Sequence, residues 1–157
     1  AFFVLENLIK RNTDLVKRME NENHLVCNHT YSHKAMVGIS EECFINELKK
    51  LENSCIELTG NQLSKYYRPP EGRFDEASLS YAQKMGYKTV FWSFAYADWD
   101  NNKQMSSEKA KSKILDNIHN GEIMLLHPTS STNAKILQEI IQELKRQGYR
   151  FGSLEEL

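Results

Sequence analysis

Two histidines separated by three residues, His29 and His33, are the side chains that most directly suggest chemistry. Two imidazoles at positions i and i+4 point the same way if the backbone turns helically between them. Neutral imidazole is a common ligand of zinc and similar divalent ions. The spacing is equally typical of a solvated pair at a helix start, but its place directly after a short apolar run favours a metal site.

A third histidine, His127, ends the apolar run Ile123 to Leu126 and is followed by Pro128. An imidazole fixed at a strand end can act as an acid or base, although it can also be a structural histidine. A zinc site with an open water position normally needs a third protein ligand, often a carboxylate, and residues 28–36 contain none. The histidine pair and His127 together predict metal-assisted hydrolysis.

The loop after residue 67 contains Arg68 and two prolines, Pro69 and Pro70, which stiffen the chain. A rigid loop of this kind can expose the N–H groups of Glu71 and Gly72 to a ligand oxygen. The alternative is an ordinary tight turn with a surface arginine, because turns rich in proline and glycine are common.

Asp98 and Trp99 follow an aromatic stretch at residues 91–96. An aspartate behind a histidine fixes its tautomer and favours its charged form. A tryptophan beside a pocket can exclude water and pack on a sugar ring. The alternative is that Trp99 belongs to the core and that Asp98 caps a turn.

The composition is that of an ordinary globular chain. Of the 157 residues 40% are hydrophobic and 26% are charged, with a net charge of −1. This balance predicts no nucleic-acid partner, and no apolar run approaches the ~20 residues that span a membrane. The three cysteines predict no disulfide framework. The sequence does not indicate the oligomeric state.

Short apolar runs alternate with amphipathic stretches, which predicts an α/β protein with parallel strands. Strands are expected near residues 2–4, 24–28, 66–67, 87–93, 123–126 and 149–151. Helices are expected to begin after residues 12 or 13, 40, 75 and 106 or 107, with a last helix over 133–146. All the candidate residues follow strands, at the end where active sites of parallel α/β proteins are built.

The motifs occur in an order and at separations typical of one family. They are His29-Thr30-x-x-His33, Arg68-Pro69-Pro70-x-Gly72, Asp98-Trp99 and Leu125-x-His127. With them the sequence resembles, over essentially its whole length, the polysaccharide deacetylases of carbohydrate esterase family 4. Residues 92–99 and 120–127 look especially like the branch that removes acetyl from N-acetylmuramic acid to make muramic δ-lactam in spore peptidoglycan.

The resemblance implies a fold and a first set of roles. The family fold is a distorted (β/α) barrel with fewer than eight strands. His29 and His33 would bind a divalent metal, usually zinc, and Arg68 would steer the catalytic aspartate. The backbone N–H of Glu71 would join the metal in holding the oxyanion, and Pro70 would contact the substrate beside it.

The resemblance also implies roles for the residues of the last third of the chain. Asp98 would orient and tune His127, the general acid. Trp99 and Leu125 would line the pocket for the acetyl methyl group. Ala95 stands where the family often has an acid, which is typical of the δ-lactam branch.

The family's first motif, a Thr-Phe-Asp-Asp run that supplies the general base and the third metal ligand, is absent from the 157 residues. We therefore expect residues 1–157 to be a polysaccharide deacetylase domain truncated at its N-terminus, an incomplete barrel lacking its first strand. The chain is expected to start inside a larger protein.

The resulting hypothesis is metal-dependent hydrolysis of the N-acetyl group of an amino sugar in cell-wall peptidoglycan, namely N-acetylmuramic acid during δ-lactam formation in the spore cortex. One alternative is a catalytically inactive, glycan-binding barrel. Others are a deacetylase of chitin-like or N-acetylglucosamine glycans and a metal-dependent hydrolase of another amide or ester. The family resemblance implies an extracellular, cell-wall or spore-associated location.

Overall fold

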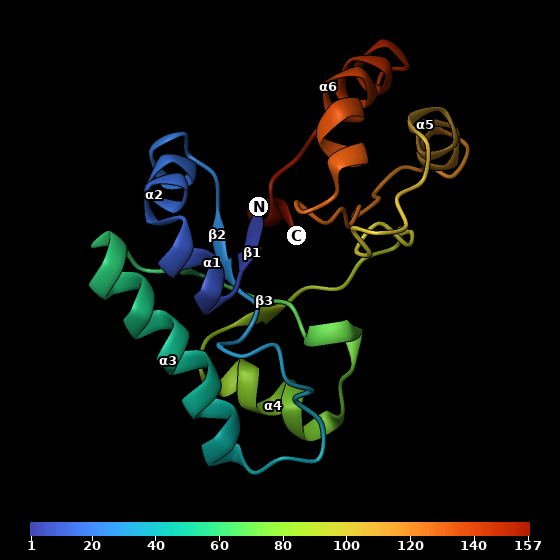
Figure 1. Ribbon diagram of the computed structural model, residues 1–157. Helices are drawn as coiled ribbons and strands as arrows, with labels where there is room; N and C mark the ends of the chain where they lie inside the picture. The colour runs from blue at the N-terminus through green and yellow to red at the C-terminus, as the bar shows by residue number, and fades with distance from the viewer. The chain divides into compact units, whose positions relative to one another are not determined.

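The structure, a computed structural model, describes residues 1–157 and divides into two compact units (Figure 1). Unit 1 is Ala1–Phe91 and unit 2 is Trp92–Leu157. Unit 1 contains all the regular strands, whereas unit 2 consists of helices joined by long irregular segments.

The four strands of unit 1 form one parallel sheet in the order β1-β2-β3-β4. Their bounds are β1 Phe2–Val4, β2 Val26–Asn28, β3 Ser64–Tyr67 and β4 Lys88–Thr89. The prediction of an α/β protein with parallel strands is confirmed. The sheet is not closed, in agreement with the expected incomplete barrel. The last strand is shorter than predicted, because the chain turns irregular after Thr89.

The helices of unit 1 connect these strands. They are α1 Glu6–Arg11, α2 Thr13–Asn21, α3 Glu41–Thr59, the 3-10 turn η1 Pro70–Gly72 and α4 Glu76–Lys84. The hydroxyl of Ser40 accepts the N–H of Cys43 at the start of α3, and Gly60 ends that helix with φ 84°. Asp75 and Ser78 form a capping box that begins α4. Both caps lie where the sequence predicts them.

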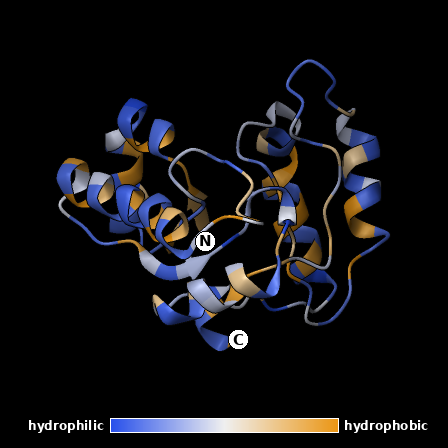
Figure 2. Ribbon diagram, turned by 90° about the horizontal axis from the view of Figure 1, so that it is seen from below, coloured by the Kyte–Doolittle hydropathy of each residue, from blue (hydrophilic) through white to orange (hydrophobic).

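Two apolar clusters hold unit 1 together. Figure 2 shows that the helices carry both hydrophobic and hydrophilic residues. The first packs α1, α2 and α3 against β1 and β2 through Val4, Ile9, Val16, Met19, Val26, Leu51, Cys55 and Leu63. The second contains Met36, Phe44, Leu48, Tyr67, Ala82 and Tyr87. The strands β2 and β3 pack against these clusters, which hold their carboxyl ends in place.

Unit 2 is built on two packed helices, α5 Ser107–Leu115 and α6 Ser131–Arg146, and ends in the 3-10 turn η2 Leu154–Glu156. Its core consists of Phe94, Tyr96, Ala110, Ile114, Ile136, Ile140 and Leu144. The strands predicted at 123–126 and 149–151 are not regular strands. A single parallel bridge between Phe94 and Met124 takes the place of the first.

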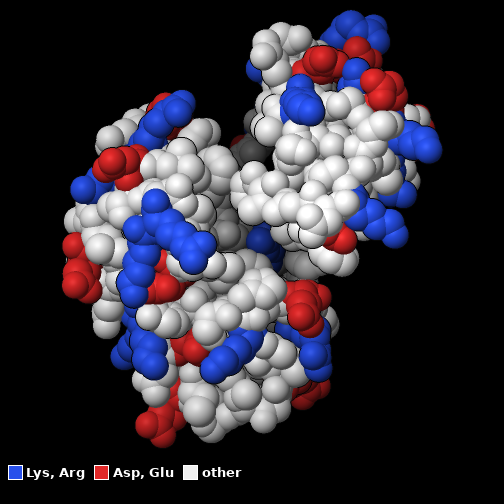
Figure 3. All heavy atoms as spheres, in the orientation of Figure 1, with Lys and Arg blue, Asp and Glu red and all other residues white.

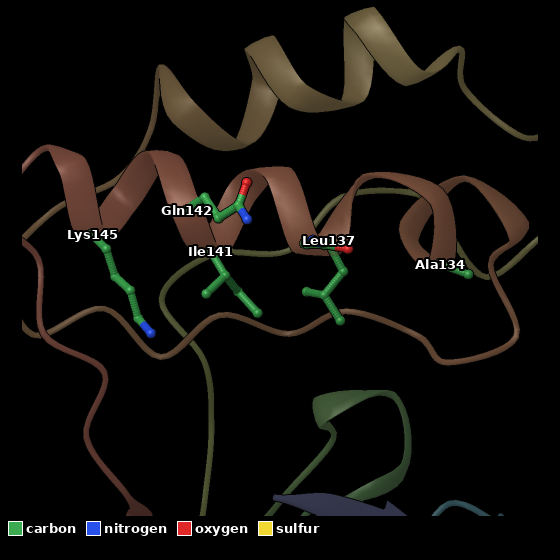
Figure 4. Close-up of a pocket in the computed structure, with 6 residues that line it drawn as sticks. Ala134, Leu137, Ile141, Gln142 and Lys145 are labelled. Carbon is green, nitrogen blue, oxygen red and sulfur yellow. The ribbon is translucent and has the colours of Figure 1, made fainter.

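The surface carries charges of both signs. On the face shown in Figure 3, Lys and Arg are interspersed with Asp and Glu, which fits the net charge of −1. None of the helices combines the length and apolar composition needed to cross a bilayer. Leu137, Ile141 and Lys145 project from one side of α6 into a shallow depression (Figure 4). No predicted site residue lines it.

Candidate active site

Asn28, the last residue of β2, fixes the start of the histidine turn in unit 1. Its side chain is fully buried. The Nδ2 atom donates to the carbonyl of Leu48 at 3.2 Å and to the hydroxyl of Tyr87 at 2.9 Å. The Oδ1 atom accepts the N–H of Thr30 at 2.9 Å. Because this buried amide is satisfied on both sides, it sets the direction in which the chain leaves the strand.

The turn from His29 to His33 is not helical. Thr30 has φ 70° and His33 has φ 58°, and the backbone N–H of His33 donates to the hydroxyl of Thr30 at 3.0 Å. Positive φ is a genuine outlier for a β-branched residue, and such strain clusters at functional sites. The two histidines therefore come together through a strained turn, not through the helical turn that their spacing suggests.

The imidazoles of His29 and His33 are in contact. Their ring centroids are 4.9 Å apart and their planes cross at 77°. His29 is buried, and its Nδ1 lies 2.7 Å from the carbonyl oxygen of Arg68. Because a carbonyl only accepts, Nδ1 carries the proton and Nε2 carries the lone pair that metals use. This donor chemistry suits a divalent cation.

The two histidines make up only part of a metal site. Within residues 1–157, no group of three or more His, Cys, Asp or Glu side chains is placed to hold a metal ion. A catalytic zinc normally has three protein ligands. Zinc binding and the origin of the third ligand therefore stay predictions.

Arg68 follows β3, where the pairing with β2 is irregular. The register shifts between Cys27, which pairs with Ser64, and Asn28, which pairs with Tyr67. Such bulges re-aim the side chains that follow. The guanidinium of Arg68 lies over the ring of Phe3, 4.9 Å from its centroid.

The loop after Arg68 presents its backbone in an unusual conformation. Glu71 has φ 58°, in the region that favours glycine. The N–H of Gly72 donates to the carbonyl of Pro69, and that of Arg73 to Pro70, both at 3.1 Å. The prediction that the Gly72 N–H faces a ligand is therefore wrong, because a carbonyl of the same turn uses it. The role of the Glu71 N–H stays a prediction.

Asp98 and His127 form a hydrogen-bonded pair in unit 2. The Nδ1 atom of His127 lies 2.6 Å from Oδ1 of Asp98, and the backbone N–H of His127 donates to Oδ2 at 2.7 Å. Asp98 is 1% exposed, whereas the imidazole of His127 is 31% exposed. A buried carboxylate thus orients an imidazole whose other side reaches solvent, which is the geometry of a poised acid or base.

Burial by itself raises the pKa of Asp98. The hydrogen bonds from the side chain and backbone of His127, its charge and a further hydrogen bond from Asn133 outweigh burial. Together they bring the pKa of Asp98 below its ordinary value of 3.8. The carboxyl is therefore ionised at neutral pH and accepts every hydrogen bond that reaches it.

The Phe94–Met124 bridge brings the segments of this pair side by side, and the N–H of Leu125 donates to the carbonyl of Phe94 at 2.9 Å. Leu125 is buried, and Trp99 is 63% exposed. Trp99 is therefore not a core residue, which removes one alternative for it. A wide exposed indole next to the buried Asp98 can pack against a ligand.

The structure divides the predicted site residues between the units. Unit 1 contains His29, His33, Arg68, Pro70 and Glu71, and unit 2 contains Asp98, Trp99, Leu125 and His127. Within unit 1 it brings together the two histidines and the backbone of Arg68, and within unit 2 it joins Asp98 and His127. The functions of these residues stay predictions.

Sequence reasoning missed Asn28, Gln104 and Asn133, which contact the candidate residues. Gln104 donates to the carbonyl of Asp98 at 3.0 Å, and Asn133 donates to Oδ2 of Asp98 at 2.5 Å. Asn133 could have been noticed as a polar residue near the start of the mostly apolar face of the last helix. A search for apolar periodicity alone does not detect such a residue.

Comparison with known proteins adds a family. The polysaccharide deacetylase profile matches residues 1–90. The chain is 37% identical over 157 residues to the Bacillus subtilis peptidoglycan-N-acetylmuramic acid deacetylase PdaA, covering all of this chain and 60% of that protein. The structure of PdaA, described as a family 4 carbohydrate esterase, superposes with a TM-score of 0.94 over 99% of this chain and 67% of the other.

Two further relatives differ in what their names state. A Bacillus cereus peptidoglycan-N-acetylglucosamine deacetylase is 32% identical over 158 residues, with 98% of this chain and 56% of that protein covered. A Bacillus anthracis structure described as a CE4 family pseudoenzyme has a TM-score of 0.88 at 28% identity, with 99% of this chain and 54% of that one covered. The chain thus spans less than two thirds of the length of these curated relatives.

Proposed function

The chain belongs to the polysaccharide deacetylase family, and from this premise we propose that the protein is a metal-dependent peptidoglycan N-deacetylase acting on N-acetylmuramic acid. The observation that carries the proposal is the contact between the imidazoles of His29 and His33, 4.9 Å apart on a strained turn. Backbone strain persists where the surrounding structure over-determines it, and it concentrates at ligand sites. Two imidazoles held in this way suit a shared cation.

His29 and His33 would hold the metal, for which we propose zinc. The carbonyl of Arg68 fixes the His29 tautomer at 2.7 Å, as outer-shell carbonyls do for metal-binding histidines. A zinc ion held by this pair would supply Lewis-acid chemistry, namely polarisation of the amide carbonyl and a lower pKa of bound water. From the family resemblance we propose that the third ligand and the general base are aspartates of the Thr-Phe-Asp-Asp motif, which residues 1–157 do not contain.

His127 would protonate the departing amine. Cleavage of an amide C–N bond requires that the nitrogen be protonated as it leaves, because an amide anion is a very poor leaving group. The Asp98 carboxylate holds Nδ1 of His127 at 2.6 Å, so Nε2 is the nitrogen that presents the transferable proton.

The remaining predicted residues would position the substrate. The Glu71 N–H would donate to the developing oxyanion, and its fixed φ of 58° supports a preset direction for that donor. Arg68 would steer the general base, and Pro70 would contact the substrate. Trp99 and Leu125 would enclose the acetyl methyl group.

The sugar is the finer part of the proposal. The PdaA name supports N-acetylmuramic acid, whereas the Bacillus cereus relative is named for N-acetylglucosamine. We propose δ-lactam formation in the spore cortex from the family resemblance of residues 92–99 and 120–127. The test incubates the zinc-loaded full-length protein with cortex peptidoglycan and with chitin oligomers, and quantifies acetate. Mass spectrometry then identifies the sugar that carries the new amine. Muramic acid is expected, and release from chitin oligomers alone would contradict it.

A second candidate function is an inactive glycan-binding protein. This alternative is supported by the structural similarity to the Bacillus anthracis pseudoenzyme, with a TM-score of 0.88. The two functions separate in one assay, since a binding protein retains peptidoglycan in a pull-down but releases no acetate at any zinc concentration.

The proposed function also implies where the protein is located and to which domain residues 1–157 belong. Peptidoglycan lies outside the cytoplasmic membrane, so we propose an extracellular, cell-wall or spore-associated protein. We also propose that residues 1–157 are part of one polysaccharide deacetylase domain, which agrees with their covering 60% of PdaA. Fractionation of cells and spores with an antibody against the protein tests the location.

A further inference from the structure

The side chain of Asn133, in α6, stands between two groups of unit 2. Its Nδ2 donates to Oδ2 of Asp98 at 2.5 Å, and its Oδ1 accepts the hydroxyl of Tyr96. Nδ2 also lies 3.4 Å from the carbonyl oxygen of His127. Asn133 is only 5% exposed, so these contacts are made away from water.

The orientation of this amide is determined by its neighbours. An ionised carboxylate only accepts, so the NH₂ group of Asn133 must face Asp98. Burial and the nearby charge of Asp98 raise the pKa of Tyr96, which keeps its hydroxyl protonated and able to donate to Oδ1. Tyr96 therefore fixes which end of the amide points at Asp98.

Helix formation does not require this side chain. The N–H of Asn133 already donates to the hydroxyl of Ser130, which caps α6. The residues that follow on the same buried face, Ile136 and Ile140, are apolar. A buried amide is costly unless it is hydrogen-bonded, so an apolar residue would suit the packing better. The carboxylate of Asp98 is the group that accounts for an amide at this position.

The two oxygens of the Asp98 carboxylate have different partners. Oδ1 faces Nδ1 of His127, while Oδ2 takes the backbone N–H of His127 at 2.7 Å and the amide of Asn133. Two fixed donors on Oδ2 prevent the carboxylate from rotating about its bond to Cβ. Gln104 adds to this by donating to the carbonyl of Asp98 and accepting the hydroxyl of Ser130 at 2.5 Å, which ties the start of α6 to the Asp98 loop.

We propose that Asn133, oriented by Tyr96, is a positioning residue that locks the Asp98 carboxylate, and so holds the imidazole of His127 with its proton-donating Nε2 presented. The catalytic meaning of this assignment rests on the proposed deacetylase function. The geometric part of the assignment does not depend on it. Without the lock, the carboxylate turns, and neutral His127 is no longer confined to the Nδ1–H tautomer.

The test compares two substitutions in the zinc-loaded full-length protein. Asn133→Leu removes the lock. Thr132→Val is the matched control, because Thr132 is 7% exposed, neighbours Asn133 on α6 and loses only its hydroxyl bond to the carbonyl of Met105. Nitrogen-15 NMR of the His127 ring reports the tautomer, and acetate release from peptidoglycan gives kcat and KM.

Asn133→Leu is expected to mix the His127 tautomers and to lower kcat by about 10- to 100-fold with KM within about twofold. Thr132→Val is expected to leave both readouts unchanged. If Asn133→Leu does not fold, Tyr96→Phe replaces it, because it removes only the hydroxyl that orients the amide. It should produce the same change in tautomer to a smaller extent.

A wild-type tautomer together with a wild-type kcat in Asn133→Leu would overturn the inference, as would an equal loss of kcat in Thr132→Val. The two proposals fail separately. A wild-type protein that releases no acetate, but whose His127 tautomer still changes in Asn133→Leu, refutes the deacetylase function and supports the positioning role.

Discussion

The two units hold their candidate residues by different physical means. In unit 1 a strained backbone adds to side-chain hydrogen bonds, since Thr30, His33 and Glu71 all have positive φ. In unit 2 no residue other than glycine has positive φ, and side-chain hydrogen bonds to Asp98 hold His127. Strain is stored in the first case, while polar groups are satisfied in the second.

This difference indicates how complete each region is without a ligand. The Asp98–His127 pair has its hydrogen-bond partners within unit 2 and is formed before any substrate arrives. The His29–His33 pair has two imidazoles in contact but no third ligand beside them. We therefore expect unit 1 to depend on a bound cation and unit 2 to be indifferent to it.

The largest effect expected is the loss of metal when the histidine pair is removed. The double substitution His29→Ala and His33→Ala should abolish zinc binding and reduce acetate release to background, because it removes both imidazoles that we propose as ligands. Elemental analysis of the purified full-length protein measures the zinc. His119→Ala is the control, since its side chain is 51% exposed and lies outside the candidate residues. Full zinc occupancy in the double variant would contradict the proposal that His29 and His33 bind the metal.

Removing the proton donor should affect the rate and not the metal. His127→Ala is expected to lower kcat by ~10²–10⁴-fold, the usual contribution of a general acid, with zinc still bound at wild-type stoichiometry. Acetate release and elemental analysis on the same preparation check both parts. Loss of zinc together with activity would show that His127 is a ligand instead of the acid.

A smaller effect is expected from the strained turn itself. Thr30→Val keeps the shape of the residue but removes the hydroxyl that accepts the His33 N–H at 3.0 Å. Zinc affinity should fall by about 10- to 100-fold, as it does when an outer-shell partner is lost. Competition with a zinc-binding dye measures it. Thr30→Ser should restore the affinity, and an unchanged affinity in Thr30→Val would contradict the account of the turn.

The smallest effect concerns a carboxylate of unit 2 that lacks the partners Asp98 has. Burial raises the pKa of Glu122 and outweighs the opposing effect of His119, whose Nε2 lies 3.7 Å from Oε2. Neither carboxylate oxygen has a hydrogen-bond partner. Because the folded state binds the proton more tightly, this group's contribution to stability falls as the pH rises above its ordinary pKa of 4.5.

Glu122→Gln should therefore raise the free energy of unfolding at pH 7, because the neutral amide places no charge in this buried position. The gain should shrink as the pH falls towards 4. Urea denaturation at several pH values measures this trend. A gain that grows on acidification would have the wrong sign for a raised pKa.

Local signals in the sequence predicted much of the fold. Ser40 and Gly60 bound α3, and Asp75 begins α4, because caps and left-handed glycines act within a few residues. The helix α1 was missed, since its six residues are too few to show a period and Leu5 offers no side-chain cap. The predicted strand at 123–126 proved to be a single bridge, because apolar runs do not reveal pairing.

The candidate site could be predicted only where residue types and their spacing along the chain indicate a function. The spacing of His29 and His33 predicted two neighbouring imidazoles, but not the strained turn that brings them together, since nothing in the residue type of Thr30 indicates positive φ. The link from Asn133 to Asp98 spans 35 residues, and a contact of that separation depends on tertiary packing.

The measurement that tests the central claim most directly is acetate release from peptidoglycan by the full-length protein before chelation, after chelation and after zinc is returned. The account predicts that release stops when the metal is removed and resumes with zinc, while the His127 tautomer stays unchanged throughout. Release that continues at an undiminished rate in the metal-free protein would contradict it.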